Sequence, residues 1–148
     1  MTELEGLLVK EQIRTLQARY VRLADSKDWH ALSGLFDESA TFTAYDVAGK
    51  VVAVMTGRRE ISSGIDAGVG SATVLHHLFS YEIEVQSDSK AHGIWSMEDW
   101  IDHQSGTEPP AFRTMRGYGH YHVDYRRMDG VWRIACLDLR RTRVDYTF

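Results

Sequence analysis

Carboxylates and imidazoles recur in this sequence beside aromatic residues, a combination suited to proton transfer. Asp25 and Asp28 lie in the segment YVRLADSKDW, and His76 and His77 lie in TVLHHLFSYEIEV. The ordinary pKa of a histidine is near ~6.5, and burial or a carboxylate neighbour can tune it for a general base. A carboxylate bonded to one ring nitrogen fixes the tautomer and stabilises the imidazolium. These residue types therefore indicate candidate acid–base chemistry.

The two aspartates have competing interpretations. On an ideal straight helix, Asp25 lies well off the apolar stripe that contains Leu16 and Tyr20, so periodicity alone does not direct it into a core. Asp28 suits an N-cap, because its carboxylate can accept from the free backbone N–H groups of a following helix. Spacing alone favours turn and cap roles for both aspartates, with a functional role for Asp25 as the alternative.

The two histidines are distinguished by strand parity. Strict alternation places Tyr81, Ile83 and Val85 on one face of a strand, which puts His77 on that apolar face and His76 on the polar one. A single β-bulge between the histidines and Tyr81 reverses this assignment. Either histidine is thus a candidate base, and the alternative is one surface histidine and one core histidine.

Two further charged groups have open interpretations. Asp99 lies in WSMEDWIDH, where it is either part of a solvated edge or a second carboxylate facing a cavity. The run near the end of the last predicted strand, residues 140–143, reads Arg-Arg-Thr-Arg. A solvated basic end that balances the acids is the favoured interpretation of that run.

The sequence offers little support for a metal or a cofactor. His120 and His122 share a strand face with Tyr118 and Asp124, and two histidines at i, i+2 can bind a metal. No third ligand has a motif-like spacing, so a polar strand face is favoured. The motifs GxGxxG, CxxC, HExxH, GxSxG and the P-loop are all absent. Acid–base chemistry without a cofactor, or plain binding, remains.

The elements that position these residues follow from periodicity and turn signals. Apolar residues at three- and four-residue steps predict a helix over residues 5–25. Further segments predict helices over Trp29–Phe36 and Arg58–Gly68, a hairpin of Ala40–Asp46 with Val51–Thr56, strands over Val74–Gln86, Ala91–His103, Arg113–Met128 and Val131–Tyr146, and a loop over Gln104–Ala111. Helices followed by long meandering strands indicate an α+β fold, in which helices cover the concave side of a bent sheet and enclose a pocket.

Composition limits the class of protein. A chain of 148 residues with 43% apolar residues fits one folded domain, residues 1–148. The net charge of −4 argues against nucleic acid as the main partner. No apolar stretch approaches the length of a membrane span, and the acidic N-terminal segment does not resemble a signal peptide. The single cysteine, Cys136, cannot form an internal disulfide, so a cytoplasmic setting is expected.

Three segments carry a family resemblance: IRTLQARYVRLADSKDWHALSGLFDESATF, HHLFSYEIEV and YRRMDGVWRIACLDLRRTRV. Together they resemble the SnoaL-like branch of the nuclear-transport-factor-like superfamily, in particular its scytalone dehydratase-like group, which includes a bile-acid dehydratase. The resemblance implies a cone-shaped, strongly bent mixed or antiparallel sheet around a deep pocket, and a homo-oligomer, either a trimer or a dimer. It also implies chemistry that needs no cofactor.

The resemblance also implies site residues. In these enzymes a histidine takes a proton from carbon, and an aspartate at the end of the first helix orients it. Asp25 matches that aspartate, and His76 matches the histidine, because the spacing from His76 to Gly93 is that of the family.

Further positions match groups that contact the substrate. Tyr20 and Asp99 match a tyrosine and a second carboxylate, and Arg141 matches a C-terminal arginine. Another pocket tyrosine falls near Ala44 or Tyr45.

The departures from the family limit the substrate. A second pocket histidine falls at Ile101 here, and the tyrosine before the aspartate is Ala24. Scytalone is therefore disfavoured, and a small hydrophobic cyclic ligand such as a steroid, terpenoid or polyketide-like ring is expected. The resemblance implies a dehydratase-type lyase. The alternatives are an isomerase or cyclase, and a non-catalytic binding protein.

Overall fold

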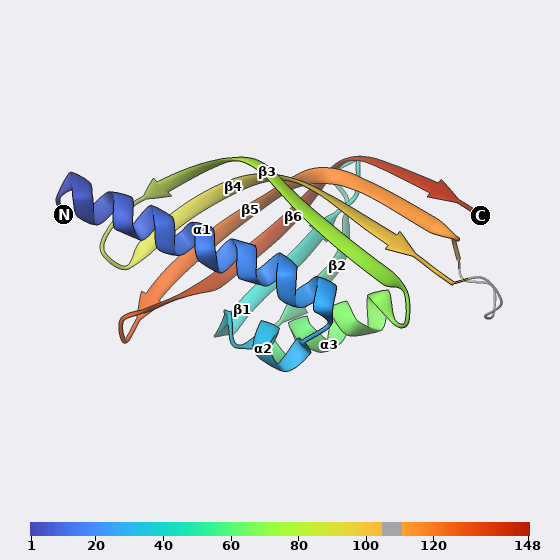
Figure 1. The fold of residues 1–148 in the computed structure, drawn as a ribbon, viewed down its shortest axis with the longest axis horizontal. Helices are drawn as coiled ribbons and strands as arrows, with labels where there is room; N and C mark the ends of the chain where they lie inside the picture. Colours follow the sequence, from blue (N-terminus) through green and yellow to red (C-terminus); the bar gives the residue numbers. More distant parts are fainter. Residues whose placement is uncertain (105–110) are drawn as a thin grey trace.

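A strongly bent mixed β-sheet forms the body of the protein, and its first helix crosses the concave side (Figure 1). The computed structural model describes residues 1–104 and 111–148. Within them, the elements are α1 (Glu3–Ser26), α2 (Trp29–Ser33), β1 (Phe36–Tyr45), β2 (Val51–Thr56), α3 (Arg58–Val69), β3 (Thr73–Val85), β4 (Lys90–Asp102), β5 (Thr114–Met128) and β6 (Val131–Thr147). The predicted α+β class is confirmed. The loop predicted over residues 104–111 falls mostly outside the described residues.

The order of the six strands is β2-β1-β6-β5-β4-β3. All neighbours are antiparallel except β1 and β6, which run parallel. This parallel pair brings the first predicted hairpin beside the last strand. The described sheet therefore has β2 and β3 at its edges, and β5 and β6 lie in its interior.

Helix α1 begins and ends with well-defined caps. Thr2 and Glu5 form a capping box, in which each side chain bonds the backbone N–H of the other residue. The helix ends where Lys27 adopts a left-handed conformation with φ 58°, and its N–H bonds the carbonyls of Leu23 and Ala24. Asp25 consequently lies in the last turn of the helix.

The second helix is shorter than periodicity predicts. It stops at Ser33, and Phe36 begins β1 instead of ending the helix. Phe36 is fully buried and pairs with Ile134 of β6, a contact that lies far along the chain. Tertiary pairing thus overrides the local helical pattern. Asp28 does cap this helix as predicted, because its side chain accepts a hydrogen bond from the Ala31 N–H at 3.2 Å.

The core lies between α1 and the inner face of the sheet. It contains Ile13, Leu16 and Tyr20 from the helix, together with Phe36 and Tyr121 from the strands. The Tyr20 ring packs edge-on against Phe36 at a centroid distance of 5.8 Å. None of the helices in the described residues is both long and apolar enough to cross a membrane.

Candidate active site

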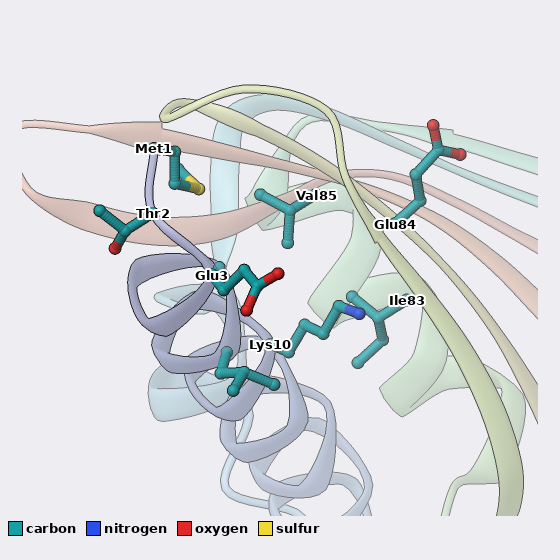
Figure 2. Close-up of a pocket in the computed structure, with 9 residues that line it drawn as sticks. Met1, Thr2, Glu3, Lys10, Ile83, Glu84 and Val85 are labelled. Carbon is teal, nitrogen blue, oxygen red and sulfur yellow. The ribbon is translucent and has the colours of Figure 1, made fainter.

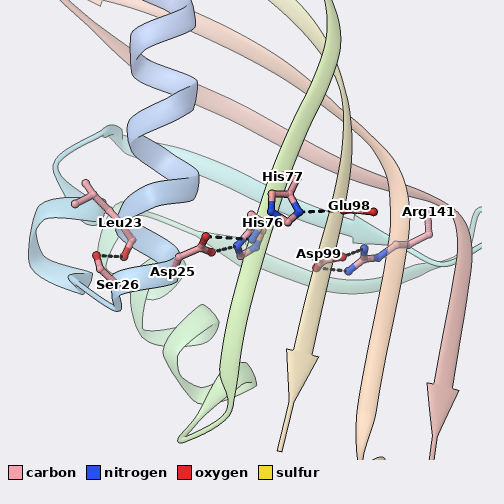
Figure 3. Close-up of polar contacts among 8 residues, drawn as sticks. All are labelled: Leu23, Asp25, Ser26, His76, His77, Glu98, Asp99 and Arg141. Atoms are coloured by element: carbon pink, nitrogen blue, oxygen red, sulfur yellow. Dashed lines mark hydrogen bonds and ion pairs between the residues drawn. The ribbon is translucent and has the colours of Figure 1, made fainter.

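An imidazole and a carboxylate from distant parts of the chain form the centre of the site (Figure 3). His76 Nδ1 lies 2.6 Å from Asp25 Oδ1, although 51 residues separate the two in sequence. The backbone N–H of His76 also donates to Asp25 Oδ2 at 3.2 Å. The side chain of His76 is 10% exposed and that of Asp25 is 27% exposed. Both carboxylate oxygens therefore hold His76, and solvent reaches the pair from the Asp25 side.

A β-bulge decides which histidine faces the helix. Leu78 pairs with Met97 and Tyr81 pairs with Trp95, so β3 carries one more residue than β4 between these pairs. The extra residue reverses the parity of the strand and turns His76 inward. His77 points to the opposite face, where its side chain is 51% exposed and its Nδ1 contacts Glu98 Oε1 at 2.9 Å. The simple alternation assigned the two histidines the other way round and is wrong here.

The bond to Asp25 prepares His76 to act as a base. A carboxylate only accepts hydrogen bonds, so the Nδ1–H form of the ring donates to Asp25. Nε2 then keeps the lone pair that can take a proton. The negative charge of Asp25 stabilises the imidazolium that this transfer produces.

A buried ion pair lies beside His76 on the inner face of the sheet. Asp99 is the direct partner of His76 across β3 and β4, and its carboxylate forms a two-pronged pair with Arg141 of β6. Arg141 Nη2 donates to Asp99 Oδ2 at 2.9 Å, and Nη1 donates to Oδ1. The Asp99 side chain is 8% exposed and the Arg141 side chain is 14% exposed. Of the interpretations open from sequence, Asp99 is the inward-facing carboxylate.

The surroundings of Arg141 favour its charged form. Burial by itself lowers the pKa of Arg141, but the hydrogen bond and the charge of Asp99 raise that pKa above its ordinary value. Arg141 faces inward in alternation with Leu137 and Leu139, and a bulge after it, where Tyr118 pairs with Arg143 while Gly119 pairs with Arg141, turns Arg143 outward. The rest of the basic run stays solvated, with Arg140 and Arg143 half or more exposed.

Gly117 makes room for the ion pair. It lies between Asp99 and β6 on the inner face of β5, and a Cβ built on it would overlap Asp99 Oδ1 and Arg141 Nη1. A residue with a side chain would therefore displace the pair. Sequence reasoning missed Gly117, although its place between Met115 and Tyr121 on one strand face is a signal of close approach.

Two buried tyrosines complete the arrangement. Tyr20 of α1 and Tyr121 of β5 are both fully buried, with ring centroids 5.8 Å apart. Burial raises the pKa of Tyr20, and the charge of Asp99 raises it further. We call Asp25, His76, Tyr20, Asp99, Arg141 and Tyr121 the inner polar cluster. Sequence reasoning missed Tyr121, because the histidines that alternate with it on the opposite face of β5 carry the stronger chemical signal.

Tyr45 does not join the inner polar cluster. It pairs with Arg140 across β1 and β6, and the Arg140 guanidinium lies over its ring at 4.8 Å from the centroid. Its neighbour Ala44 instead shares the inner face with Leu139. Of the two positions left open from sequence, the structure therefore places Ala44 on the side of the cluster and Tyr45 on the outer face.

The histidines of β5 lie on that outer face too. The ring of His122 lies 6.5 Å from that of His92, which belongs to the neighbouring strand β4. His92 Nδ1 in turn contacts Asp124 Oδ1 of β5 at 2.7 Å. Burial lowers the pKa of His122, and the charge of Arg140 lowers it further. In residues 1–104 and 111–148, no three histidine, cysteine, aspartate or glutamate side chains are grouped to hold a metal ion.

Two hollows open beside α1, and neither is lined by Asp25 or His76. A hollow of about 710 Å³ opens between the start of α1 and the end of β3 (Figure 2). Its walls include Glu3, Lys10 and Glu84 but contain no base bonded to a carboxylate. A groove of about 310 Å³ lies farther along the helix at the β3 bulge. Neither hollow is lined by the inner polar cluster, so chemistry and not cavity size identifies the candidate site.

Comparison with solved structures places the fold among known proteins. A hexachlorocyclohexane dehydrochlorinase of type 2 superposes with a TM-score of 0.82 at 16% identity, covering 99% of this chain and 94% of that one. A candidate scytalone dehydratase from Novosphingobium aromaticivorans superposes with a TM-score of 0.80 at 19% identity, covering 99% and 93%. A Mycobacterium tuberculosis protein of unknown function gives 0.76 at 24% identity, covering 97% and 78%. These likenesses show the fold, whose relatives include dehydrochlorinases and dehydratases.

Comparison of the sequence itself gives a family. A search of curated proteins finds no match. The model of the SnoaL-like domain matches residues 5–138, which is most of the chain and spans every residue of the inner polar cluster except Arg141. On this match, and with the fold that it implies, the chain belongs to the SnoaL-like domain family.

Proposed function

We propose that this protein is a cofactor-independent lyase that eliminates water, or a similar leaving group, from a small hydrophobic cyclic substrate. One observation carries the proposal: Asp25 holds the His76 ring at Nδ1 at a distance of 2.6 Å, inside a largely buried cluster. The dehydrochlorinases and the candidate dehydratase among the similar structures support this class of reaction.

In the proposed reaction, His76 Nε2 takes a proton from a substrate carbon. The electron pair of that C–H bond becomes the new C=C bond, and the bond from the adjacent carbon to the leaving oxygen breaks. The imidazolium returns its proton to the departing hydroxide, which leaves as water. Atoms and charges balance without a cofactor. A general base is worth roughly 10² to 10⁴ in rate, so the abstracted proton must already be acidified, for example by a neighbouring carbonyl.

Two other members of the inner polar cluster bind the polar parts of the substrate. Tyr20 donates a hydrogen bond to the leaving hydroxyl, and Arg141, held by Asp99, polarises the carbonyl. Because the surrounding side chains are buried, water is largely excluded from the cluster, and both interactions are stronger than in water. The cluster carries one unpaired negative charge when His76 is neutral, since Arg141 is already matched by Asp99. It therefore suits an uncharged ring better than a carboxylate.

The decisive experiment compares two adjacent histidines. Purified His76→Gln and His77→Gln variants are assayed on a library of hydroxylated ketones and steroids, with loss of 18 mass units read by mass spectrometry as the sign of dehydration. We expect His76→Gln to lose about 10²- to 10⁴-fold in rate. His77 has a carboxylate partner as well but lies on the outer face, so His77→Gln should keep wild-type activity.

Other results of this experiment have definite meanings. Wild-type activity in His76→Gln would remove His76 from the mechanism. A product of unchanged mass that requires His76 would indicate an isomerase or cyclase, which uses the same base without a leaving group. Ligand binding with neither product, and no exchange of substrate C–H for deuterium, would indicate a binding protein.

The expected homo-oligomer, a trimer or a dimer, remains a prediction, as does the cytoplasmic setting. Light scattering on the purified protein measures the first of these directly. A monomer at all concentrations would contradict it.

A further inference from the structure

We propose that Tyr121 is a positioning residue of the candidate site, whose hydroxyl donates a hydrogen bond to the Tyr20 hydroxyl and so directs the Tyr20 proton toward the leaving group. The inference rests on the proposed function and extends it to a residue that touches no substrate. Its physical content is a pair of hydroxyls in series, one on α1 and one on β5.

The first argument is geometric. The rings of Tyr20 and Tyr121 lie 5.8 Å apart at an angle of 53°, and both residues are fully buried. On the inner face of β5, the two positions that precede Tyr121 are Gly119 and Gly117. At these two glycines the inner face of β5 has no side chain, and the Asp99–Arg141 ion pair occupies the space beside Gly117. Tyr121 is thus the last side chain of β5 before the charged part of the cluster.

The second argument concerns where the hydroxyl protons go. A buried hydroxyl needs a partner, and each tyrosine has one proton to donate. Among the influences on the pKa of Tyr20, hydrogen bonding from Tyr121 lowers it, although burial and the charge of Asp99 outweigh this effect. Asp99 is also the charge that most raises the pKa of Tyr20. The negative side of the cluster therefore attracts the Tyr20 proton, and Tyr20 accepts the proton of Tyr121.

The consequence is a better donor at Tyr20. Hydrogen bonds in series polarise one another, by roughly 10–30% per bond. A hydroxyl that accepts from Tyr121 gives its own proton more readily to an oxygen that becomes negative as its bond to carbon breaks. Tyr121 should therefore matter most when the leaving group is a poor one, such as hydroxide.

The chain provides a matched control in Tyr125. Tyr125 lies four residues on, on the same inner face of β5, and is also fully buried. Its hydroxyl accepts from Trp95 Nε1 at 2.9 Å and donates to Gln17 Oε1 at 2.6 Å. This second network lies apart from the inner polar cluster, so Tyr125→Phe removes a buried hydroxyl without touching Tyr20.

The kinetic test uses two substrates on one ring skeleton, one with a hydroxyl leaving group and one with a better leaving group such as acetate. We expect Tyr121→Phe to lower kcat for the hydroxyl substrate about five- to tenfold, the value of one hydrogen bond, with KM unchanged. The acetate substrate should be little affected. In a Tyr20→Phe background, Tyr121→Phe should have no further effect, because the donor it acts through is gone.

A second measurement needs no substrate. Protein labelled at tyrosine Cζ with carbon-13 reports the hydrogen bonding of each hydroxyl by NMR. We expect Tyr121→Phe to shift the Tyr20 resonance, and Tyr125→Phe to leave it in place. A Tyr20 resonance unmoved by Tyr121→Phe overturns the proposal whatever the activity.

Two further outcomes separate the proposal from the function on which it rests. If the Tyr20 resonance moves but Tyr121→Phe slows both substrates equally, the hydroxyl pair exists and its catalytic role is refuted. If the wild-type protein eliminates nothing while the resonance moves, the proposed lyase function fails and the hydroxyl pair stands.

Discussion

His76 and Asp99 lie directly opposite each other on β3 and β4, yet each is bonded to a different charged partner. Asp25 holds His76 from α1, and Arg141 holds Asp99 from β6. With a neutral imidazole, these four groups carry a formal charge of −1, and proton uptake by His76 brings it to zero. Taking a proton therefore relieves a charge imbalance in a largely buried cluster, which favours His76 as a base.

The first prediction concerns the partner of the base. Asp25→Asn keeps the shape of the side chain but replaces one accepting oxygen with a donor, and it removes the charge that stabilises the imidazolium. We expect kcat for elimination to fall by about 10²- to 10⁴-fold, with the far-ultraviolet circular dichroism spectrum unchanged. Asp28→Asn is the control, because asparagine is an equally good N-cap and Asp28 does not contact His76. A rate within twofold of wild type for Asp25→Asn would falsify the assigned role.

The second prediction concerns the buried ion pair. Arg141→Met leaves the Asp99 carboxylate with no cation in a site where it is only 8% exposed. Removing one partner of a buried pair costs about 3–5 kcal/mol in the free energy of unfolding, measured by urea titration. Asp99→Asn combined with Arg141→Met should recover part of this loss, because neither charge remains.

A neighbouring arginine provides the control for that measurement. Arg140 is half exposed, and its ion pair with Asp138 lies near the surface at 3.4 Å. Arg140→Met should therefore change the free energy of unfolding by only about 0–1 kcal/mol. Equal losses in Arg140→Met and Arg141→Met would show that the Asp99–Arg141 pair has no special role in stability.

The third prediction concerns Gly117. Replacing a strand glycine with alanine usually stabilises a sheet, but here the new Cβ would overlap Asp99 and Arg141. We expect Gly117→Ala to destabilise the protein by about 1–3 kcal/mol, the usual range for overpacking, and to slow elimination as the ion pair shifts. Gly68→Ala in α3 has open space around it and should be neutral or slightly stabilising. Thermal unfolding of the two variants decides the matter, and a Gly117→Ala protein as stable as Gly68→Ala would contradict the packing argument.

The fourth prediction concerns alkaline pH. Burial raises the pKa of Tyr20, Tyr121 and Tyr125 above the ordinary value of 10.0. Above that pH the unfolded chain loses these protons while the folded protein keeps them, so the unfolded state binds fewer protons and stability falls as pH rises. Below pH 10 the contribution is fully present.

Urea unfolding between about pH 9 and pH 11 measures this effect. Each buried tyrosine contributes a slope of up to ~1.4 kcal/mol per pH unit above its unfolded pKa. Tyr125→Phe should reduce the slope, whereas Tyr146→Phe, at an exposed position, should not. A free energy of unfolding that stays constant over this range would show that the tyrosines titrate alike in both states.

Much of the fold follows from local patterns in the sequence. The apolar stripe of α1, the third helix at residues 58–69, and the four long strands lie within a few residues of their predicted bounds. The cap at Asp28 is confirmed as well, because an N-cap depends only on the residues that follow it. The boundary at Phe36 was not predictable in this way, since a parallel pairing with β6 sets it.

The positions of the candidate site residues depend on irregularities in strand pairing. Alternation alone turns His76 outward, and the basic run at residues 140–143 is expected to be solvated. One bulge in β3 turns His76 toward Asp25. One bulge in β6, where Asp124 pairs with Cys136 while Tyr125 pairs with Ile134, sets the alternation that turns Arg141 toward Asp99. The extra residue in each case is defined only by the partner strand, so single-sequence periodicity cannot locate it.

The sequence by itself determined which reactive side chains are present: an acid at the end of the first helix, two adjacent histidines, an acid among tryptophans, and a basic run in the last strand. It also determined the α+β order of the elements that carry them. Only the tertiary structure decided that His76 and not His77 contacts Asp25. It also decided that Arg141 pairs with Asp99 beside Gly117. It placed Tyr121 in the inner polar cluster and Tyr45 outside it. The physical reason is that a residue's type is local, whereas the face of a sheet on which it lies depends on pairing with strands far along the chain.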